Sequence, residues 1–406
     1  MSYQADILGT HINILSGFAF KSNDFVDSGI PVIKIKNITP PNVSMDDLSY
    51  VLDDVIPSKY ILNYDDVLIA MTGSHINQMA SVVGRVARVK CSEKTALNQR
   101  VGKITVIDPD DCDLDYVYYY LSQEKVKIEL ANKAGGAANQ ANISPTDIKN
   151  LEIPFPNINI QRKISSVLRA YDDLIENNQK QIKLLEEAAQ RLYKEWFVDL
   201  RFPGHENTKI TDGVPEGWRM AVLSEIASVN KESISKQYPY DYVDYIDIGA
   251  VSKGQINSVT RLSTKDAPGR AKRIAFDGDV LWGMVRPNLK SYALVFHPKE
   301  TSVFSTGFAI LHAEKVPFSF LYCHVTQDEF VSYLINCTNG AAYPAVKPSH
   351  FENAVLLVPT DMVLSKFHSL VGQMFRQAEI LEQKNQQAIE ARDRLLPKLM
   401  SGEIEV

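Results

Sequence analysis

The chain has 406 residues, with 45% hydrophobic residues, 23% charged residues and a formal net charge of −6 at pH 7. This length accommodates two or three domains with their own cores, and the composition is typical of globular proteins rather than disordered or fibrous ones. The net negative charge excludes a uniformly basic nucleic-acid coat, although local basic patches can still steer binding.

Neither membrane insertion nor a disulfide framework is expected. No apolar run reaches the roughly 18 residues of a membrane-spanning helix, and the opening MSYQADILGT lacks the features of a signal peptide. The cysteines Cys91, Cys112, Cys323 and Cys337 form no Cys-x-x-Cys pair, which favours reduced thiols. We therefore expect a cytoplasmic protein that makes no membrane contact.

The first lobe is expected over residues 1–158 as a mixed α/β domain built from short strands. Residues 31–36 alternate apolar and polar side chains, as a half-buried strand does. Further strands are predicted at 66–70, 80–89 and 102–107, followed by a helix at 116–130.

A long helix is expected next, over residues 159–200. Its apolar positions alternate in steps of four and three, which is the a/d pattern of a coiled-coil seam. These positions are Ile164, Leu168, Tyr171, Ile175, Asn178, Ile182, Leu185, Ala189, Leu192 and Trp196.

Residues 201–213 are predicted to be a polar linker, and residues 214–360 a second lobe that repeats the first. Residues 117–141 and 321–345 align without a gap, 204 positions apart. The second lobe has its expected helix at 320–334.

A second, weaker seam in residues 361–406 runs from Phe367 to Leu399 and is interrupted by Arg392. We expect the two helices to form an antiparallel coiled coil in which paired residue numbers sum to 563. Trp196 then meets Phe367, and Asn178 meets Asn385. Alternatively, each helix packs only on its own lobe. The expected fold is therefore α+β and pseudo-twofold symmetric.

At this point the chain resembles a known family along nearly its full length. The segments that carry the resemblance are Gly17-Phe-Ala-Phe-Lys-Ser22, Ile30-Pro-Val-Ile-Lys-Ile-Lys-Asn37, Asp66-Val-Leu-Ile-Ala70, Leu151-Glu-Ile-Pro-Phe-Pro156, Leu192-Tyr-Lys-Glu-Trp-Phe197, Val214-Pro-Glu-Gly-Trp218 and Leu399-Met-Ser-Gly-Glu403. Their order resembles the specificity subunit of type I restriction-modification enzymes. The first lobe departs from the pattern, because no Pro-Glu-Gly-Trp segment opens it.

The resemblance implies that each lobe is a target recognition domain that reads one half of an asymmetric, bipartite site in the major groove of double-stranded DNA. It implies that the coiled coil sets the half-site spacing and docks two adenine-N6 methyltransferase subunits. Those partners carry S-adenosylmethionine, and motor-nuclease subunits that use ATP and Mg²⁺ join them. The chain itself is then a non-catalytic subunit with no cofactor, acting in defence against foreign DNA.

The two alternative functions are a stand-alone DNA nuclease or methyltransferase, and a coiled-coil scaffold that binds only protein. The chain has no Gly-x4-Gly-Lys-Ser/Thr loop and no Asn-Pro-Pro-aromatic motif. Pro109-Asp110 with Asp147-Ile-Lys149 fits a nuclease pattern, but Asp147 more simply lies in the first turn of a short helix. We therefore expect no catalytic residue and no metal site.

Candidate DNA contacts lie in loops that follow matched strands of the two lobes, and in a basic cluster of the second lobe. Asn and Gln side chains suit adenine, Arg suits guanine, and Lys suits phosphate. The first-lobe candidates are Thr72, Ser74, His75, Asn77, Gln78, Asn98, Gln99, Arg100, Gln140 and Asn142. The second-lobe candidates are Lys272, Arg273, Arg286, Asn288, Lys290, Ser305, Thr306, Tyr343 and Lys347. Each could instead be a turn former or a solvated loop residue.

The end of the first long helix is a candidate partner surface. Tyr193, Trp196 and Phe197 are large aromatic residues of the kind enriched in protein interfaces. Alternatively, they cap the coiled coil or pack on the second lobe.

Overall fold

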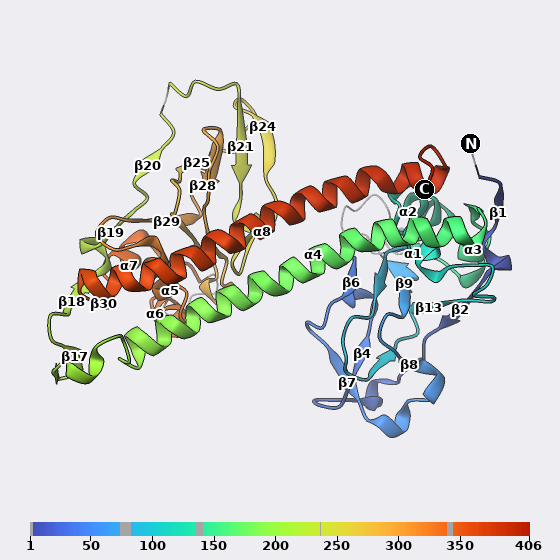
Figure 1. The fold of residues 1–406 in the computed structure, drawn as a ribbon, viewed down its shortest axis with the longest axis horizontal. Coiled ribbons are helices and arrows are strands. Elements are labelled where there is room, and N and C mark those ends of the chain that lie inside the picture. Colours follow the sequence, from blue (N-terminus) through green and yellow to red (C-terminus); the bar gives the residue numbers. More distant parts are fainter. Residues whose placement is uncertain (1–2, 74–82, 135–140, 236, 339–343) are drawn as a thin grey trace. The chain divides into compact units, whose positions relative to one another are not determined.

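The computed structural model describes residues 3–73, 83–134, 141–235, 237–338 and 344–406. The chain divides into two compact units. The first unit comprises residues 1–177 and 384–406, and the second comprises residues 178–383. Each unit therefore contains one strand-rich lobe together with parts of both long helices (Figure 1).

The lobe of the first unit is built on two main sheets. The larger sheet has the strand order β2 (Ile12–Ser16), β13 (Val101–Val106), β9 (Val67–Ala70), β11 (Val86–Arg88), β6 (Asn42–Val43) and β5 (Ile38–Thr39). The second sheet has the order β3 (Phe25–Val26), β7 (Ser49–Val51), β4 (Ile30–Ile33), β12 (Thr95–Leu97) and β8 (Ile61–Leu62). Two short antiparallel pairs complete the lobe: β1 (Ala5–Ile7) with β15 (Glu152–Pro154), and β10 (Thr72–Gly73) with β14 (Ala141–Asn142).

The lobe of the second unit repeats this plan. Its four-stranded sheet has the order β19 (Ala227–Val229), β29 (Phe308–Ala313), β26 (Val280–Gly283) and β27 (Tyr292–Leu294). Its five-stranded sheet has the order β20 (Glu232–Ser233), β25 (Ala271–Ile274), β28 (Ser302–Ser305), β21 (Tyr242–Ile246) and β24 (Thr260–Ser263). The shorter pairs are β16 (Ile210–Thr211) with β17 (Val214–Pro215), β18 (Arg219–Val222) with β30 (Val355–Val358), and β22 (Val251–Ser252) with β23 (Gln255–Ile256).

The single helix predicted at 116–130 is two helices, α1 (Leu114–Ser122) and α2 (Glu124–Lys133). The backbone is extended at Gln123, and polar side chains satisfy the last carbonyls of α1. Ser122 donates from its hydroxyl to the carbonyl of Tyr118, and Gln123 donates from its side-chain amide to that of Tyr120. These hydrogen bonds replace the helical ones that would continue α1.

The second lobe has the same break, between α5 (Phe318–Val325) and α6 (Asp328–Asn336). Thr326 and Gln327 donate to the carbonyls of Tyr322 and Cys323. Each lobe also has one short helix further along the chain, α3 (Pro145–Lys149) in the first and α7 (Pro348–Glu352) in the second.

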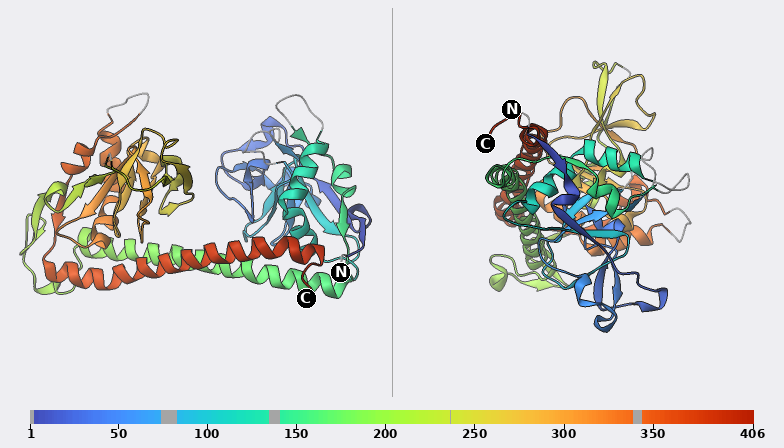
Figure 2. Two further views of the ribbon diagram at one scale, coloured as in Figure 1. Left: turned by 90° about the horizontal axis from the view of Figure 1, so that it is seen from above. Right: turned by 90° about the vertical axis from the view of Figure 1, so that its right-hand side faces the viewer.

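The long helices are α4 (Ile158–Tyr193), followed by one π-helical turn (Lys194–Val198), and α8 (Asp361–Ser401). Within each unit they lie side by side and antiparallel (Figures 1 and 2). In the second unit the rings of Trp196 and Phe367 lie 5.8 Å apart between centroids, and Ile182 packs with Leu381. In the first unit, residues 164 and 399 belong to one buried cluster. The predicted register is thus confirmed within each unit.

The two lobes are attached to the long helices by different chemistry. In the first unit, Arg169 of α4 pairs with Asp65 at 2.5 Å and with Asp115 at 2.6 Å. Asp172 of α4 accepts a hydrogen bond from the Tyr119 hydroxyl at 2.6 Å and pairs with Arg392 of α8 at 2.6 Å. Arg392, which interrupts the seam in the sequence, therefore forms an ion pair between the two helices.

In the second unit the attachment is aromatic. The ring of Phe197 lies 5.0 Å from that of Phe320 and 4.8 Å from that of Phe367, and Phe375 of α8 lies 5.1 Å from Tyr322. All these rings are buried in one continuous cluster with the sheet of the lobe. Among the helices in the described ranges, none is long and apolar enough to span a membrane.

Phe367 is fully buried between both long helices and the second lobe, so Phe367→Ala should destabilise the second unit by about 3–5 kcal/mol through lost burial and the remaining cavity. The matched control Leu370→Ala lies one turn further along α8 at 48% exposure and should cost about 0.5 kcal/mol or less. All three tryptophans of the chain, Trp196, Trp218 and Trp282, lie in this unit. Urea unfolding followed by tryptophan fluorescence therefore measures it selectively, and equal midpoints for the two variants would contradict the packing described.

Candidate nucleic-acid interface

Three segments of the first lobe meet where strand β9 ends. Met71 donates from its backbone N–H to the carbonyl of Arg100 at 3.0 Å, and Ile143 donates to the carbonyl of Met71 at 2.9 Å. The Thr72 hydroxyl donates to the side-chain oxygen of Asn142 at 2.8 Å. These bonds join residues 71–73, 98–100 and 141–143, which we call the loop end of the first lobe.

The second lobe has the same backbone arrangement where strand β26 ends. Met284 donates to the carbonyl of Gly307 at 2.9 Å, and Val346 donates to the carbonyl of Met284 at 2.9 Å. Arg286 donates from its backbone N–H to the carbonyl of Pro344 at 2.8 Å. Residues 284–290, 305–307 and 344–347 form the loop end of the second lobe. This geometry agrees with the expectation that the matched loops occupy equivalent places within their lobes.

The predicted residues at the loop end of the first lobe differ in accessibility. Gln99 and Arg100 are exposed, and Asn98 is half-buried. Thr72 is only 5% exposed, so its hydroxyl serves the contact with Asn142. The remaining first-lobe candidates lie outside the described residues: Ser74, His75, Asn77, Gln78 and Gln140.

The loop end of the second lobe presents Arg286, Asn288 and Lys347 as exposed side chains. Arg286 and Lys290 have positive φ angles of 51° and 54°, on either side of a short 3₁₀ turn at Pro287–Leu289. Two left-handed residues bend the backbone sharply here and project this segment away from its strand. Lys290 also pairs with Asp328 at 2.6 Å, which lowers the pKa of that carboxyl.

Ser305, predicted as a DNA contact, is instead 1% exposed. Its hydroxyl accepts a hydrogen bond from the backbone N–H of Gly307 at 3.2 Å, so it stabilises the turn. Thr306 beside it is half-buried, and Tyr343 lies outside the described residues. The prediction for Ser305 used only its position at the end of a strand, and that position does not show whether the side chain faces the core.

The basic residues Arg270, Lys272 and Arg273 of the second lobe lie on and beside β25. This strand pairs with β28 next to the turn at 305–307. Lys272 is exposed, whereas Arg273 is half-buried and donates to the Ser233 hydroxyl at 3.4 Å. Burial lowers the pKa of Arg273. Arg270 was missing from the predicted contacts, yet its carbonyl accepts from the backbone N–H of Thr306 at 2.8 Å, and its guanidinium pairs with Asp247 at 2.6 Å. Its position among other basic residues in the sequence indicates that Arg270 belongs with the candidate contacts.

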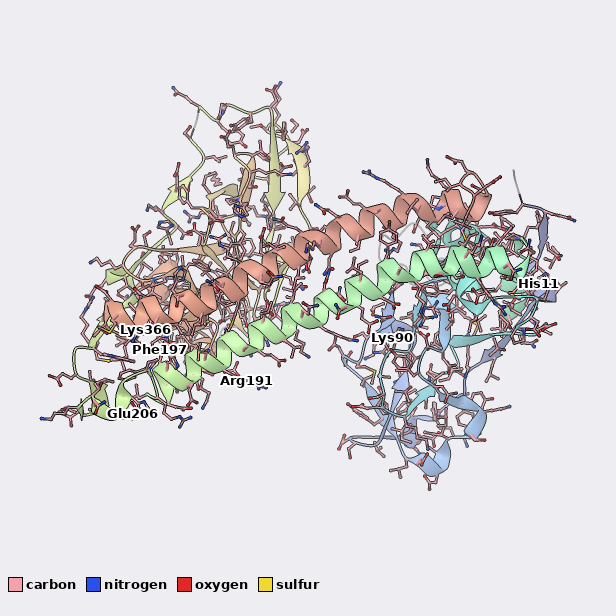
Figure 3. All side chains as sticks on the ribbon, in the orientation of Figure 1. His11, Lys90, Arg191, Phe197, Glu206 and Lys366 are labelled. Atoms are coloured by element: carbon pink, nitrogen blue, oxygen red, sulfur yellow. The ribbon has the colours of Figure 1, made fainter. Side chains whose placement is uncertain are left out.

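The aromatic residues predicted as a partner surface are buried in the second unit. Tyr193, Trp196 and Phe197 are 5%, 7% and 7% exposed, and the Tyr193 hydroxyl lies 2.9 Å from Nδ1 of His324. Phe197 lies beside the start of α8, close to Lys366 (Figure 3). Packing on the second lobe, the alternative considered for these residues, accounts for their position.

Within the described residues, no group of three or more His, Cys, Asp or Glu side chains is placed to hold a metal ion. Asp147, the centre of the nuclease-like pattern, accepts hydrogen bonds from the backbone N–H and the hydroxyl of Ser144, both at 2.7 Å. The carboxylate thus caps the first turn of α3, as the sequence suggested.

Comparison with known proteins agrees with the duplicated architecture. The family described as type I restriction modification DNA specificity domain matches residues 10–187. The chain is 28% identical over 330 residues to the type I restriction enzyme MjaIX specificity subunit of Methanocaldococcus jannaschii, covering 77% of this chain and 74% of that protein. It is 26% identical over 184 residues to the MjaVIII specificity subunit of the same organism, covering 45% and 42%.

The fold is also similar to a solved structure. The crystal structure of a type I restriction-modification system S subunit from M. genitalium superposes with a TM-score of 0.59 at 16% identity, covering 98% of this chain and 96% of that one. Fold, family match and relatives agree with the motifs in the sequence. Residues 10–187 contain the DNA specificity domain of type I restriction-modification systems, and the chain is similar along most of its length to the specificity subunits of these systems.

Proposed function

We propose that each lobe reads one half of a bipartite DNA site through its loop end, and that the two halves differ in sequence. The observation that carries this proposal is that equivalent backbone hydrogen bonds hold unlike loops in the two lobes. Met71 and Met284 occupy matched places, yet the segments that follow them share almost no residues. A common frame with different side chains reads different bases.

The chemistry of the exposed side chains supports this assignment. At the loop end of the first lobe, Gln99 suits an adenine edge and Arg100 suits a guanine edge. The second lobe presents Arg286 and Asn288 in a sharply bent turn. Lys272, which is exposed on β25, supplies a charge that suits phosphate, and a phosphate contact positions the protein without reading sequence.

We further propose that the long helices set the half-site spacing and dock two methyltransferase subunits. The seams of α4 and α8 are offset by 203 residues, so Val167 and Leu370 occupy matched positions. They are 37% and 48% exposed within their own units. An apolar residue exposed at the same place on each helix suits two copies of one partner. These partners would carry S-adenosylmethionine, and motor-nuclease subunits would supply ATP-dependent chemistry.

Arg286→Ala should reduce binding to the cognate site at least tenfold, because it removes a side chain able to bond two acceptors of guanine. Binding to random DNA should change little. Competition binding of the assembled methyltransferase complex with both DNAs measures the difference. The matched control is Lys315→Ala, an exposed cation at the opposite end of the same sheet. Equal effects of the two substitutions would remove Arg286 from base recognition.

Lys272→Ala should weaken binding to cognate and random DNA by similar factors. Loss of one phosphate contact lowers the slope of log K against log salt by about 0.9. A salt titration of DNA affinity on both sequences measures this slope. A loss confined to the cognate site would assign Lys272 to base recognition instead.

Val167→Glu and Leu370→Glu should each remove one of the two methyltransferase subunits, and the double variant should remove both. A carboxylate introduced at an apolar contact leaves an unpaired charge on association. Native mass spectrometry of the reconstituted complex counts the subunits. Val259→Glu, on an exposed apolar residue of the second lobe, is the control and should retain both. Retention of two subunits by the double variant would place docking elsewhere.

A further inference from the structure

The second unit contains a polar cleft of 520 Å³ between α4 and its lobe. Glu186, Gln190 and Arg191 line it from α4, the last labelled in Figure 3. Tyr292 of β27 and Tyr322 of α5 line it from the lobe. The cleft is separate from the loop end of this lobe, because none of residues 284–290, 305–307 and 344–347 lines it.

Three groups in this cleft are unpartnered. Tyr292 and Tyr322 are 4% and 5% exposed, and throughout the described ranges neither hydroxyl has a hydrogen-bond partner. The same holds for the carboxylate of Glu186. Their oxygens are not among the fully enclosed side-chain atoms that lack a partner, so a ligand group that enters the cleft can reach them.

The three groups converge. A methyl group at Gly254, whose φ is +81°, would lie 3.1 Å from Oε1 of Glu186 and 3.7 Å from the Tyr322 hydroxyl oxygen. The glycine therefore leaves space that both groups face. The rings of Tyr292 and Tyr322 have centroids 6.1 Å apart and are nearly perpendicular, at 83°. Both rings are buried, so the groups that face this space are the Glu186 carboxylate and the tyrosine hydroxyls, a set suited to a cationic hydrogen-bond donor.

Lys183, Arg191 and Lys253 line the cleft, yet in the described structure none of them forms an ion pair with Glu186. Burial raises its pKa to about 7, the nearby Lys253 lowers it, and Glu382 of α8 raises it further. The carboxylate thus lies in a partly desolvated site without a salt-bridge partner.

The first unit has a matched cleft of 530 Å³. It is lined by Tyr118, Ser122, Gln123 and Glu124, the counterparts of residues 322, 326, 327 and 328 at the repeat offset of 204. In this cleft the chain supplies its own arginine, because Arg392 lines it and pairs with Asp172. At the seam offset of 203, the counterpart of Arg392 is residue 189, an alanine. The second cleft therefore lacks an arginine at this position, and Arg191, which lines it from α4, makes no ion pair with Glu186 in the described structure.

We propose that the cleft of the second unit binds a basic side chain of a partner protein, with a guanidinium as the best fit. A guanidinium can pair with Glu186 and donate to the tyrosine hydroxyls at once. Glu186, Glu187 and Asp328 balance the three cations of the lining, so the cleft carries no net positive charge to attract a DNA phosphate. The partner is a methyltransferase subunit. This identification rests on the proposed function, whereas the chemistry of the cleft is independent of it.

The isolated chain tests the cleft directly. N-acetyl-L-arginine amide should bind saturably with a Kd on the order of millimolar, measured by NMR chemical-shift changes of the labelled chain. The citrulline analogue, which has the same shape without charge, should bind at least tenfold more weakly. Glu186→Gln should weaken arginine binding at least tenfold, whereas Glu206→Gln, on an exposed carboxylate of the same unit that does not line the cleft, should change it less than twofold. Equal binding of both probes, or equal effects of both variants, would overturn the proposal.

Folding and partner binding are checked separately. Tryptophan fluorescence and the thermal midpoint of Glu186→Gln should match the unsubstituted chain. This variant should lower affinity for the methyltransferase subunit at least fivefold and leave DNA affinity unchanged. Arginine binding without any methyltransferase association would contradict the proposed function and leave the cleft chemistry standing. Unchanged methyltransferase affinity would overturn the assignment of the partner, and a tenfold gain in DNA affinity would assign the cleft to DNA.

Discussion

The packing of α4 against α8 is the constraint on which both lobes depend. The core of the first unit includes Leu399 and Met400, which lie at the far end of the sequence, and both are almost fully buried. The core of the second unit includes Tyr193 and Phe197, which follow the first lobe in the chain. Each lobe is therefore completed by a helix from the other repeat. A register shift of the seam would disturb both cores, which explains why a duplicated chain maintains one register.

Different interactions attach the two lobes to equivalent helices, and this difference disfavours the docking of either lobe on the site of the other. Asp172, at the seam offset of 203, corresponds to Phe375. The first is bound by Tyr119 and Arg392, whereas the second packs on the ring of Tyr322. Placing the second lobe on the site of the first would put Cys323, the counterpart of Tyr119, near Asp172 and remove this hydrogen bond. Similar lobes can thus share a frame and still dock in only one way.

Periodicity in the sequence predicted the strands, the two long helices and their register, because those features follow from which face is apolar. The breaks after Ser122 and Val325 were missed because the apolar pattern continues through them, and the cause is a side-chain hydrogen bond to the preceding turn. The role of Arg392 could not be read from sequence, since its partner Asp172 lies 220 residues away. Likewise, the sequence around Ser305 is typical of a strand end and does not indicate that the hydroxyl accepts a hydrogen bond within a buried turn.

The backbone hydrogen bonds of the loop ends explain how recognition can vary while the fold does not. Met71 and Met284 each donate to and accept from neighbouring segments through main-chain atoms, so the frame does not depend on the loop side chains. Thr72 and Ser305 add side-chain bonds within it, whereas Arg100 and Arg286 are exposed. Because exposed residues contribute little to stability, they can change without unfolding the lobe. The same separation applies to the matched clefts, where Arg392 pairs with Asp172 in the first unit and Glu186 has no ion-pair partner among the described residues of the second.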